Sequence, residues 1–203
     1  ASQIEDLVRQ HSGDNRRLAL DRLSFMACDA LRQKGLMLVD GEAIAEHSRA
    51  LKSAEELTLM RASMAVCEQA CRALPEALQP GITENALWAQ LHETNIRLGG
   101  EWIETRLLSS GPRTNPWFRE CSMRPIERDD LVSFDTDLIG PYGYCSDISR
   151  AWLCGDRPND EQRRLYAAAY EQIETNIAVL APGLSFREVS QRCWKIPKAY
   201  LSQ

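Results

Sequence analysis

The chain has 203 residues, of which 44% are hydrophobic and 26% are charged, a composition typical of a globular protein in water. Its formal net charge of −5 argues against a protein held on nucleic acid by bulk electrostatics, so we expect no nucleic-acid partner. No apolar run is long enough to span a membrane, and the N-terminus does not have the pattern of a signal peptide. Because the sequence lacks an initiator Met, we expect it to start inside a longer protein.

The first predicted elements lie in residues 14–50, where a short β-prone run, a helix ended by Gly35 and a second β-prone run follow one another. This order predicts the last part of an α/β domain, and we assign residues 1–50 to that domain. The next domain is expected to cover residues 51–203.

The second domain opens with a capping box, in which the side chains of Ser53 and Glu56 each accept from the other residue's backbone amide. Apolar residues then recur at steps of three and four, which predicts a long amphipathic helix with a buried stripe. Within that stripe we expect Met60 and Met64 to pack in the core rather than to form a binding surface. Cys67 and Cys71 lie one helical turn apart and could bind a metal with two more ligands, but no His or Cys pair nearby completes such a set, so core packing is favoured.

All seven cysteines together are odd in number and scattered. Such usage favours reduced, mostly buried thiols over a disulfide framework, and it predicts a cytoplasmic protein.

The helix of the second domain is followed by a break, Leu-Gln-Pro-Gly-Ile-Thr at residues 78–83, and by another helix that we expect to start after Thr83. A second long helix, followed by Leu-Ala-Pro-Gly-Leu-Ser at residues 180–185 and a new helix start, repeats this pattern about a hundred residues later. The repeat predicts two similar α/β halves that share one sheet, with the second half cut off at Gln203.

The most informative segment lies between the two copies of this pattern. In residues 132–138, apolar side chains alternate with polar ones, which predicts a strand with one apolar face and one face that carries Asp135 and Asp137, roughly 7 Å apart. A Gly-Pro-Tyr-Gly turn follows, and a return strand can bring Asp147 to the same place. Three clustered carboxylates repel one another unless a cation lies between them, and carboxylate oxygen suits hard or borderline divalent metals. The alternative is that these aspartates only solvate a hairpin, and the spacing by itself leaves both interpretations open.

From about Ser53 onward, the sequence resembles the first half of the pita-bread fold of methionine aminopeptidase, prolidase and creatinase, a fold of the α/β (α+β) class. The resemblance rests on the motifs Lys-Ser-x-Glu-Glu-x-x-x-Met-Arg at 52–61, Pro-Gly-Ile-Thr-Glu at 80–84, Ser-Gly-Pro-x-x-Asn at 110–115 and Asp-Ile-Ser-Arg at 147–150. Residues 1–50 resemble the end of the N-terminal domain of creatinase-type proteins. The family implies a site of two divalent metal ions, with its first ligands on this strand pair and a His and two Glu in the second half.

Two departures narrow the resemblance. The peptidases usually separate their two aspartates by eleven residues, whereas Thr136 stands at that distance from Asp147, with an aspartate on each side of it. The peptidases also carry a proton-handling His in the loop before the metal strand, where this chain has Trp117. The two motifs Ser-Ser-Gly-Pro-Arg-Thr-Asn-Pro-Trp-Phe and Phe-Asp-Thr-Asp-Leu-Ile-Gly together are similar to those of the dimethylsulfoniopropionate lyases of the DddP type.

This resemblance implies a metal-dependent lyase that cleaves dimethylsulfoniopropionate to dimethyl sulfide and acrylate by β-elimination. It implies that Asp135, Asp137 and Asp147 are all metal ligands and that the two metals are iron, although the residues alone permit other transition metals. The substrate is a small sulfonium compound, whose cation an aromatic face attracts, so Trp117 is the candidate for binding it; packing under the loop is the alternative. A homodimer without membrane or nucleic-acid partners is implied as well.

The rest of the site is expected outside this chain. No histidine follows His92, so the remaining ligands and the general base are expected beyond Gln203, and no catalytic residue is assigned within the chain. The chain alone is therefore predicted to be inactive and unable to complete a two-metal site. Two other functions stay open: a peptidase of the prolidase or Xaa-Pro aminopeptidase kind, and a non-catalytic pita-bread scaffold that binds partners.

Arginines crowd the segment before the aspartate strand, and they could steer an anionic group or form a solvated, mobile face. Arg150 follows the last aspartate and is expected to pair with a ligand carboxylate. The five arginines of the segment are Arg106, Arg113, Arg119, Arg124 and Arg128.

Overall fold

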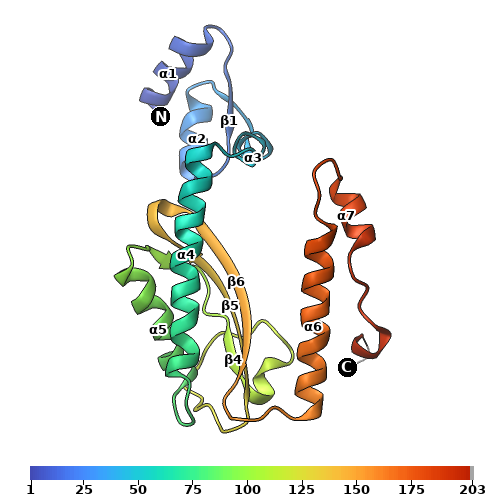
Figure 1. The fold of residues 1–203 in the computed structure, drawn as a ribbon. Helices are drawn as coiled ribbons and strands as arrows, with labels where there is room; N and C mark the ends of the chain where they lie inside the picture. The colour runs from blue at the N-terminus through green and yellow to red at the C-terminus, as the bar shows by residue number, and fades with distance from the viewer. Residues whose placement is uncertain (202–203) are drawn as a thin grey trace. The chain divides into compact units, whose positions relative to one another are not determined.

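A computed structural model describes residues 1–201 of the chain, which divides into two compact units, Ala1–Arg61 and the part that begins at Ala62. Helices and strands alternate in the first unit, whereas in the second unit two helices precede the strands and two follow them, and both arrangements fall within the expected α/β (α+β) class (Figure 1). The predicted domain boundary after residue 50 coincides with the end of helix α3 and lies a few residues before helix α4 begins at Ala54. The assignment of the domains themselves stays a prediction.

The first unit contains the predicted strand, helix and strand. Its two strands are parallel, with Arg17 opposite Met37, and this pairing requires the crossover helix that connects them. Val8, Leu31 and Leu36 form a small core of their own. The elements of this unit are α1 (Ser2–Ser12), β1 (Arg17–Leu20), α2 (Phe25–Gln33), β2 (Met37–Asp40) and α3 (Glu42–Ala50).

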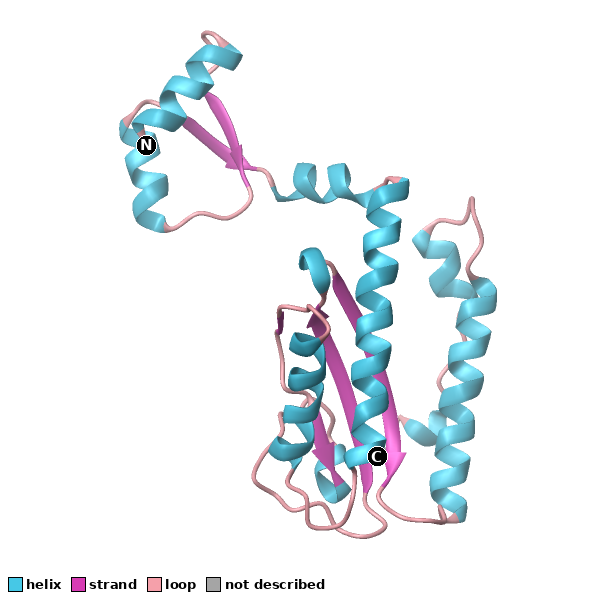
Figure 2. Cartoon of the chain, turned by 60° about the vertical axis from the view of Figure 1, so that its left-hand side comes forward, coloured by secondary structure: helices cyan, strands magenta, loops and turns pink. Residues whose placement is uncertain are grey.

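The second unit is built around a four-stranded antiparallel sheet. Strand β5 lies in its centre, with β6 on one side and β3 and β4 on the other (Figure 2). The long helix α4 and the helix α5 cover one face of this sheet. The strands are β3 (Trp102–Ile103), β4 (Leu108–Ser110), β5 (Leu131–Ile139) and β6 (Cys145–Leu153). The two helices are α4 (Ala54–Ala77), whose residues from Ala62 on belong to this unit, and α5 (Glu84–Arg97).

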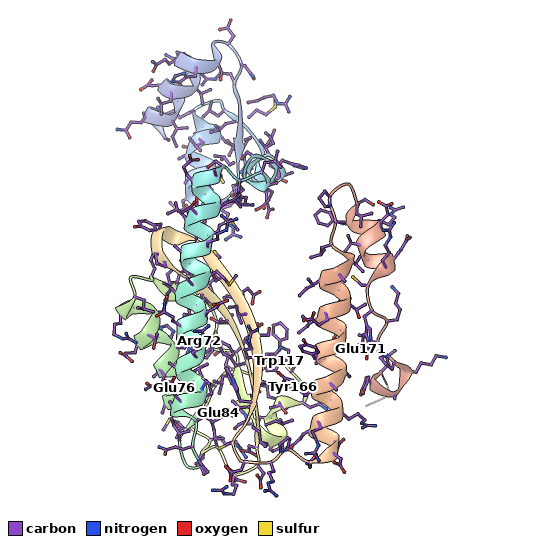
Figure 3. All side chains as sticks on the ribbon, viewed as in Figure 1. Arg72, Glu76, Glu84, Trp117, Tyr166 and Glu171 are labelled. Atoms are coloured by element: carbon purple, nitrogen blue, oxygen red, sulfur yellow. The ribbon has the colours of Figure 1, made fainter. Side chains whose placement is uncertain are left out.

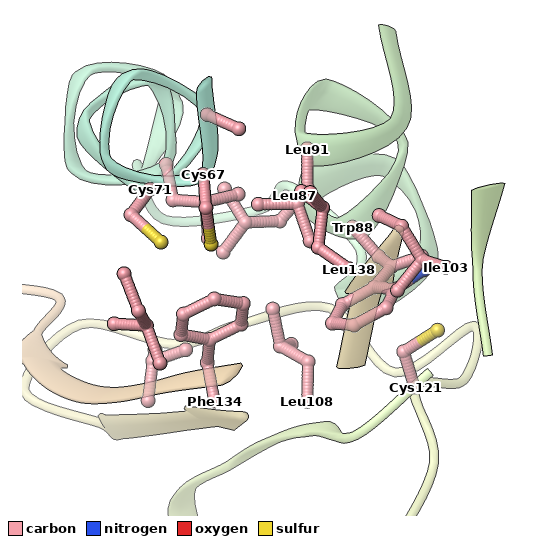
Figure 4. Packing of buried hydrophobic residues seen from close by; sticks show 14 of the residues in the cluster. Cys67, Cys71, Leu87, Trp88, Leu91, Ile103, Leu108, Cys121, Phe134 and Leu138 are labelled. Carbon is pink, nitrogen blue, oxygen red and sulfur yellow. The ribbon is translucent and has the colours of Figure 1, made fainter. Parts of the chain in front are cut away.

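The main core fills the space between this sheet and the two helices (Figure 4). At its centre the Phe134 ring, 1% exposed, lies 6.0 Å from the Trp88 ring of α5 and 5.4 Å from the Trp152 ring of β6. Cys67 and Cys71 belong to the same core, so the expected packing role of this pair is confirmed. All seven cysteines are free, and four of them are buried.

The buried stripe of α4 differs from the predicted one at its start. Met64 is 40% exposed, so its predicted burial is wrong, whereas the neighbouring Ser63 is fully buried. The Ser63 hydroxyl bonds to the Tyr144 carbonyl oxygen at 2.6 Å and contacts the Ser146 hydroxyl at 2.9 Å, so a polar contact replaces apolar packing here. Such a contact makes the burial of a hydroxyl tolerable and fixes the helix against the start of β6.

The helix starts follow the sequence signals. The Ser53 amide donates to the Glu56 carboxylate at 2.7 Å and the Glu56 amide donates to the Ser53 hydroxyl at 3.2 Å, which confirms the predicted capping box. Thr83 caps α5, and Ser185 caps α7 in the second copy of the pattern. The remaining helices are α6 (Asp160–Val179) and α7 (Phe186–Arg192), with short 3-10 turns η1 (Gly111–Thr114), η2 (Pro141–Gly143) and η3 (Lys198–Tyr200). Within residues 1–201, no helix is both long and apolar enough to cross a membrane.

Candidate metal centre

The three aspartates named from the sequence lie on one face of the β5–β6 pair. Asp137 stands directly opposite Asp147, and Asp135 stands opposite Ser149. Residues that face each other across two strands point to the same side of the sheet, and side chains alternate along each strand. Asp135, Asp137 and Asp147 therefore share a face, as the alternation in the sequence predicted.

The other face of β5 is the one that α4 and α5 cover. Along this strand the residues alternate strictly between buried and half-buried, and the buried set is Val132, Phe134, Thr136 and Leu138. Asp135 and Asp137 are half-buried and Asp147 is exposed. The strand pair thus presents its carboxylates on the side away from the core.

The carboxylates also influence one another electrostatically. The pKa of Asp147 is raised above its ordinary value, first by partial desolvation of its carboxyl group, although the residue as a whole is exposed, and then by the negative charge of Asp135, by a hydrogen bond with that residue and by the charge of Asp137. Each of these effects disfavours the ionised form. The side chain of Asp147 is therefore close enough to the other two for their charges to raise its pKa.

Two hydroxyl groups hold the aspartates of β5. Ser149 on β6 donates to Asp135 Oδ1 at 2.5 Å, and Thr105 donates to Asp137 Oδ2 at 3.0 Å. The backbone contributes as well, since the Asp135 amide donates to the Leu107 carbonyl oxygen at 2.9 Å. Hydrogen bonds of this kind restrict the rotation of a carboxylate and leave its remaining lone pairs free to accept.

The chemistry of these donors fits a hard or borderline divalent cation, because all of them are carboxylate oxygens and their negative charges are gathered on one face. The geometry is not that of a formed site, however. Across the 201 residues that the structure describes, no group of three or more His, Cys, Asp or Glu side chains is arranged so that it could hold a metal ion. The chain therefore supplies carboxylate donors on a common face without a complete coordination shell.

Trp117 lies in the connection between β4 and β5, just after η1, and it is half-buried. Figure 3 shows it between the β5–β6 strands and α6. The end of its loop returns to the sheet through a bridge between Leu107 and Glu120, and Leu107 also accepts the hydrogen bond from the Asp135 amide. The loop is thus attached next to the strand that carries two of the aspartates.

The arginines differ from expectation. Arg150 stands opposite Phe134 and so points to the helix-covered face, where it lines a hollow with Arg72 and Cys71, and its predicted pairing with a ligand carboxylate is wrong. It lies an odd number of residues after Asp147, and side chains alternate along a strand, so the two must point to opposite faces.

Of the five arginines before β5, two do not form a mobile face. The side chains of Arg113 and Arg124 are only 24% and 20% exposed, and each pairs with a carboxylate. Arg106 and Arg128 are exposed and pair with Glu120 and Asp156.

Sequence reasoning missed the residues that support the aspartates. Ser149 could have been found, since it lies two residues after Asp147 and must share its face. Thr105 gives no such signal, because only the three-dimensional structure brings it within reach of Asp137. The partners of Arg113 and Arg124 were missed for the same reason.

Residues 58–202 match the sequence profile of metallopeptidase family M24. The chain belongs to this family. The dimethylsulfoniopropionate lyase DddP of Roseovarius nubinhibens is 42% identical over 209 aligned positions, which cover 100% of this chain and 47% of that protein. The enzyme of the same name from Roseobacter denitrificans is 43% identical over 94% of this chain and 44% of its own length. The chain thus spans about half the length of the curated relatives it matches.

The fold is that of the pita-bread proteins, as predicted. The Xaa-Pro dipeptidase from Bacillus anthracis matches with a TM-score of 0.84 over 94% of this chain and 54% of that one, at 20% sequence identity. At that level of identity the match establishes the fold and leaves the chemistry open. The similarity to the DddP enzymes, suggested by the loop motifs around Trp117 and Asp135, is confirmed.

Proposed function

We propose that the protein containing this chain is a metal-dependent lyase that cleaves dimethylsulfoniopropionate to dimethyl sulfide and acrylate. The observation that carries the proposal is a triplet of mutually repelling carboxylates on one free face, in a chain that is 42% identical over its whole length to a dimethylsulfoniopropionate lyase. The proposal assigns the metal-ligand role to Asp135, Asp137 and Asp147. It assigns the binding of the substrate's sulfonium group to Trp117.

The proposed reaction needs one base and no acid. A general base takes the proton from the carbon next to the substrate carboxylate, and that electron pair forms the new carbon–carbon double bond. The bond between the β-carbon and sulfur breaks, and sulfur leaves with the bonding pair as neutral dimethyl sulfide. Because the leaving group is neutral, no side chain has to protonate it. The base is not assigned to any residue of this chain.

The metal ions would contribute one thing: a bound divalent cation withdraws charge from the substrate carboxylate and so makes the neighbouring proton more acidic. The chain's own residues prepare for this. Ser149 and Thr105 fix the rotation of Asp135 and Asp137 through their hydrogen bonds. The pKa of Asp147 is raised, so a proton competes with a cation for this carboxylate more than it does for an ordinary aspartate.

Trp117 would bind the other end of the substrate. A sulfonium is a soft, weakly hydrated cation, and the face of an indole ring attracts such cations more strongly than other aromatic rings do. A half-buried ring is suited to this task, because it is held in place and still has surface to offer. The sulfur loses its positive charge as its bond breaks, so this attraction serves binding more than the chemical step.

The proposal also includes the metal ions, the missing ligands, the oligomeric state and the location of the protein. We further propose two divalent metal ions per complete site, with iron as the metal; membership of metallopeptidase family M24 supports the divalent metals. The remaining ligands, a His and two Glu, and the general base are expected in the part of the protein that this chain does not cover. A homodimer and a cytoplasmic location belong to the proposal in the same way.

One observation favours a second function. The family is one of metallopeptidases, and the chain shares the fold of an Xaa-Pro dipeptidase. An Xaa-Pro peptidase is therefore the alternative. It is the weaker candidate, because amide hydrolysis needs a proton carrier for the leaving amine, and Trp117 stands near the place where the peptidases carry their His.

The test is an assay of the complete protein that contains this chain, loaded with iron. One sample receives dimethylsulfoniopropionate and is analysed for dimethyl sulfide by gas chromatography, and a second receives an Xaa-Pro dipeptide and is analysed for free proline. We expect sulfide and no proline. Proline release without sulfide would establish the peptidase instead. The variant Asp137→Asn, which keeps the size of the side chain, should lose both metal and sulfide production.

A further inference from the structure

The most completely buried charged side chain of the described residues lies outside the carboxylate face. Glu84 is the first residue of α5 and is 0% exposed. Its Oε1 accepts from the amide and the hydroxyl of Ser110, both at 2.8 Å. Its Oε2 accepts from the amide of Ser122 at 3.0 Å, from the hydroxyl of Ser122 at 2.6 Å and from a guanidinium nitrogen of Arg113.

All five partners of this carboxylate are donors, so only a group that accepts with both oxygens fits the site. A buried charge is tolerable when it is paired and fully hydrogen-bonded, and Glu84 meets both conditions. An amide in the same place would direct an N–H group at one of the two serine amides. Glu84→Gln thus changes the chemistry of the site while keeping the volume of the side chain.

The partners of Glu84 lie at the two ends of one loop. Ser110 ends β4, and Ser122 closes the loop that contains η1 and Trp117. Arg113 braces the loop from inside, because it also donates to the Ser122 hydroxyl at 2.6 Å and to the Glu120 carbonyl oxygen at 2.9 Å. Figure 3 labels both Glu84 and Trp117.

The start of the loop is equally constrained. Gly111 has a φ of +54°, in the left-handed region, and an added Cβ would lie 2.3 Å from the Asp130 side chain. Arg124 donates both to that carboxylate and to the Ser110 hydroxyl, each at 2.6 Å. The two sequence motifs Pro-Gly-Ile-Thr-Glu and Ser-Gly-Pro-x-x-Asn are therefore joined physically through Glu84.

We propose that Glu84 is a positioning residue, whose carboxylate clamps both ends of the loop 111–121 and so holds Trp117 ready for a sulfonium group. The proposal rests on the substrate-binding role proposed for Trp117. It does not make Glu84 a catalytic residue, since its oxygens are occupied by donors of the chain itself.

The kinetic test uses the complete protein and a double-mutant cycle. Trp117→Leu should raise KM for dimethylsulfoniopropionate by about 2- to 30-fold, the range that a lost cation–π contact gives, with kcat nearly unchanged. Glu84→Gln should show the same split between KM and kcat. Because Glu84 acts through the ring, the double variant should be no worse than Trp117→Leu alone. Additive losses, or a fall of kcat alone in Glu84→Gln, would overturn the proposal.

The structural test uses the complete protein labelled with 5-fluorotryptophan and observed by ¹⁹F NMR. The signal of Trp117 is identified by its absence in Trp117→Leu. In Glu84→Gln this signal should shift or broaden, whereas that of Trp88, on the same helix and in the core, should stay in place. Glu93→Gln, which removes an exposed charge from α5, is the matched control and should move neither signal. An unmoved Trp117 signal in Glu84→Gln would overturn the clamp.

A milder variant covers the case in which Glu84→Gln does not fold. Ser122→Ala deletes one donor and keeps the charge, and it should displace the Trp117 signal in the same direction by a smaller amount. If the complete protein releases no sulfide, the proposed function fails, and the NMR signal then decides the clamp separately: a displaced Trp117 signal supports it and an unmoved one overturns it.

Discussion

Replacement of Asp147 by Asn should stabilise the metal-free protein. The pKa of Asp147 is raised by partial burial and by the charges of Asp135 and Asp137, so the native chain disfavours the ionised form that prevails at neutral pH. Only Asp137 stands directly opposite Asp147, and one cross-strand pair of charges changes stability by about 0.2–1 kcal/mol. Because Asp147 is exposed and water screens its charge, the relief is at most about 1 kcal/mol, and the melting temperature should rise by up to about 4 °C.

The pH dependence of stability tests independently whether Asp147→Asn stabilises the protein. A carboxyl group whose pKa is raised in the folded state costs its full amount of stability at pH above the folded-state pKa, and this cost is lost as the pH falls below the unfolded-state pKa of 3.8. The gain in stability from Asp147→Asn should therefore be present at pH 7 and absent well below pH 3.8. Thermal melts followed by circular dichroism, in the presence of a chelator, measure it.

A matched control is the exposed Asp156, whose carboxylate lies 3.5 Å from the guanidinium group of Arg128 and so has a positive charge beside it. Asp156→Asn should bring no gain, since exposed ion pairs contribute little. In the complete protein saturated with divalent metal, the order should reverse, because the parent gains binding free energy that Asp147→Asn loses. A lower melting temperature for Asp147→Asn than for the parent, at pH 7 in chelator, would refute the idea that these carboxylates repel one another.

Three further measurements follow from the structure. Calorimetric titration of the 203-residue chain with divalent iron, manganese or zinc should show no pair of tight, independent sites. The reason is that no group of three or more His, Cys, Asp or Glu side chains among residues 1–201 is arranged to hold a metal. Two such sites would contradict the proposal that the rest of the protein supplies part of the ligand set. Phe134→Ala should lower the free energy of unfolding by about 3–5 kcal/mol in urea titrations, since it removes a ring packed between Trp88 and Trp152, and a loss below about 1 kcal/mol would contradict the described core. Burial lowers the pKa of His92 below its ordinary value of 6.5, so stability should fall as the pH drops below 6.5, and His92→Gln should flatten that part of the curve.

The carboxylate face could be predicted because it follows from local rules alone. Alternating side chains define the two faces of β5, and the Gly-Pro-Tyr-Gly turn brings the return strand back beside it. The same rules would have placed Arg150 correctly, since an odd offset from Asp147 means the opposite face. Its expected pairing with a carboxylate failed because closeness in sequence was taken for closeness in space.

The support of the site could not be predicted in this way. Glu84 binds groups that lie 26 to 38 residues further along the chain, and Ser63 contacts Ser146 across 83 residues. No periodicity or capping signal relates such partners, because their proximity is decided by the packing of α4 and α5 on the sheet. Burial of Ser63 in place of Met64 has the same origin: the hydrophobic pattern of the helix is overridden by a hydrogen bond to a distant strand.

A peptidase and a lyase can share one metal frame, because both reactions need a divalent cation to withdraw charge from the substrate, and the aspartates alone do not distinguish them. The difference must then lie in the groups that handle the leaving group. An amine leaves an amide only with a proton, whereas a sulfide leaves a sulfonium without one, so a proton carrier is needed in the first case and an aromatic surface is useful in the second. Under the proposed function, the group that makes this difference is Trp117, and it lies in a loop whose two ends are fixed by a buried carboxylate with five donors. Such an arrangement would allow residue 117 to change while the metal strands beside it stay as they are.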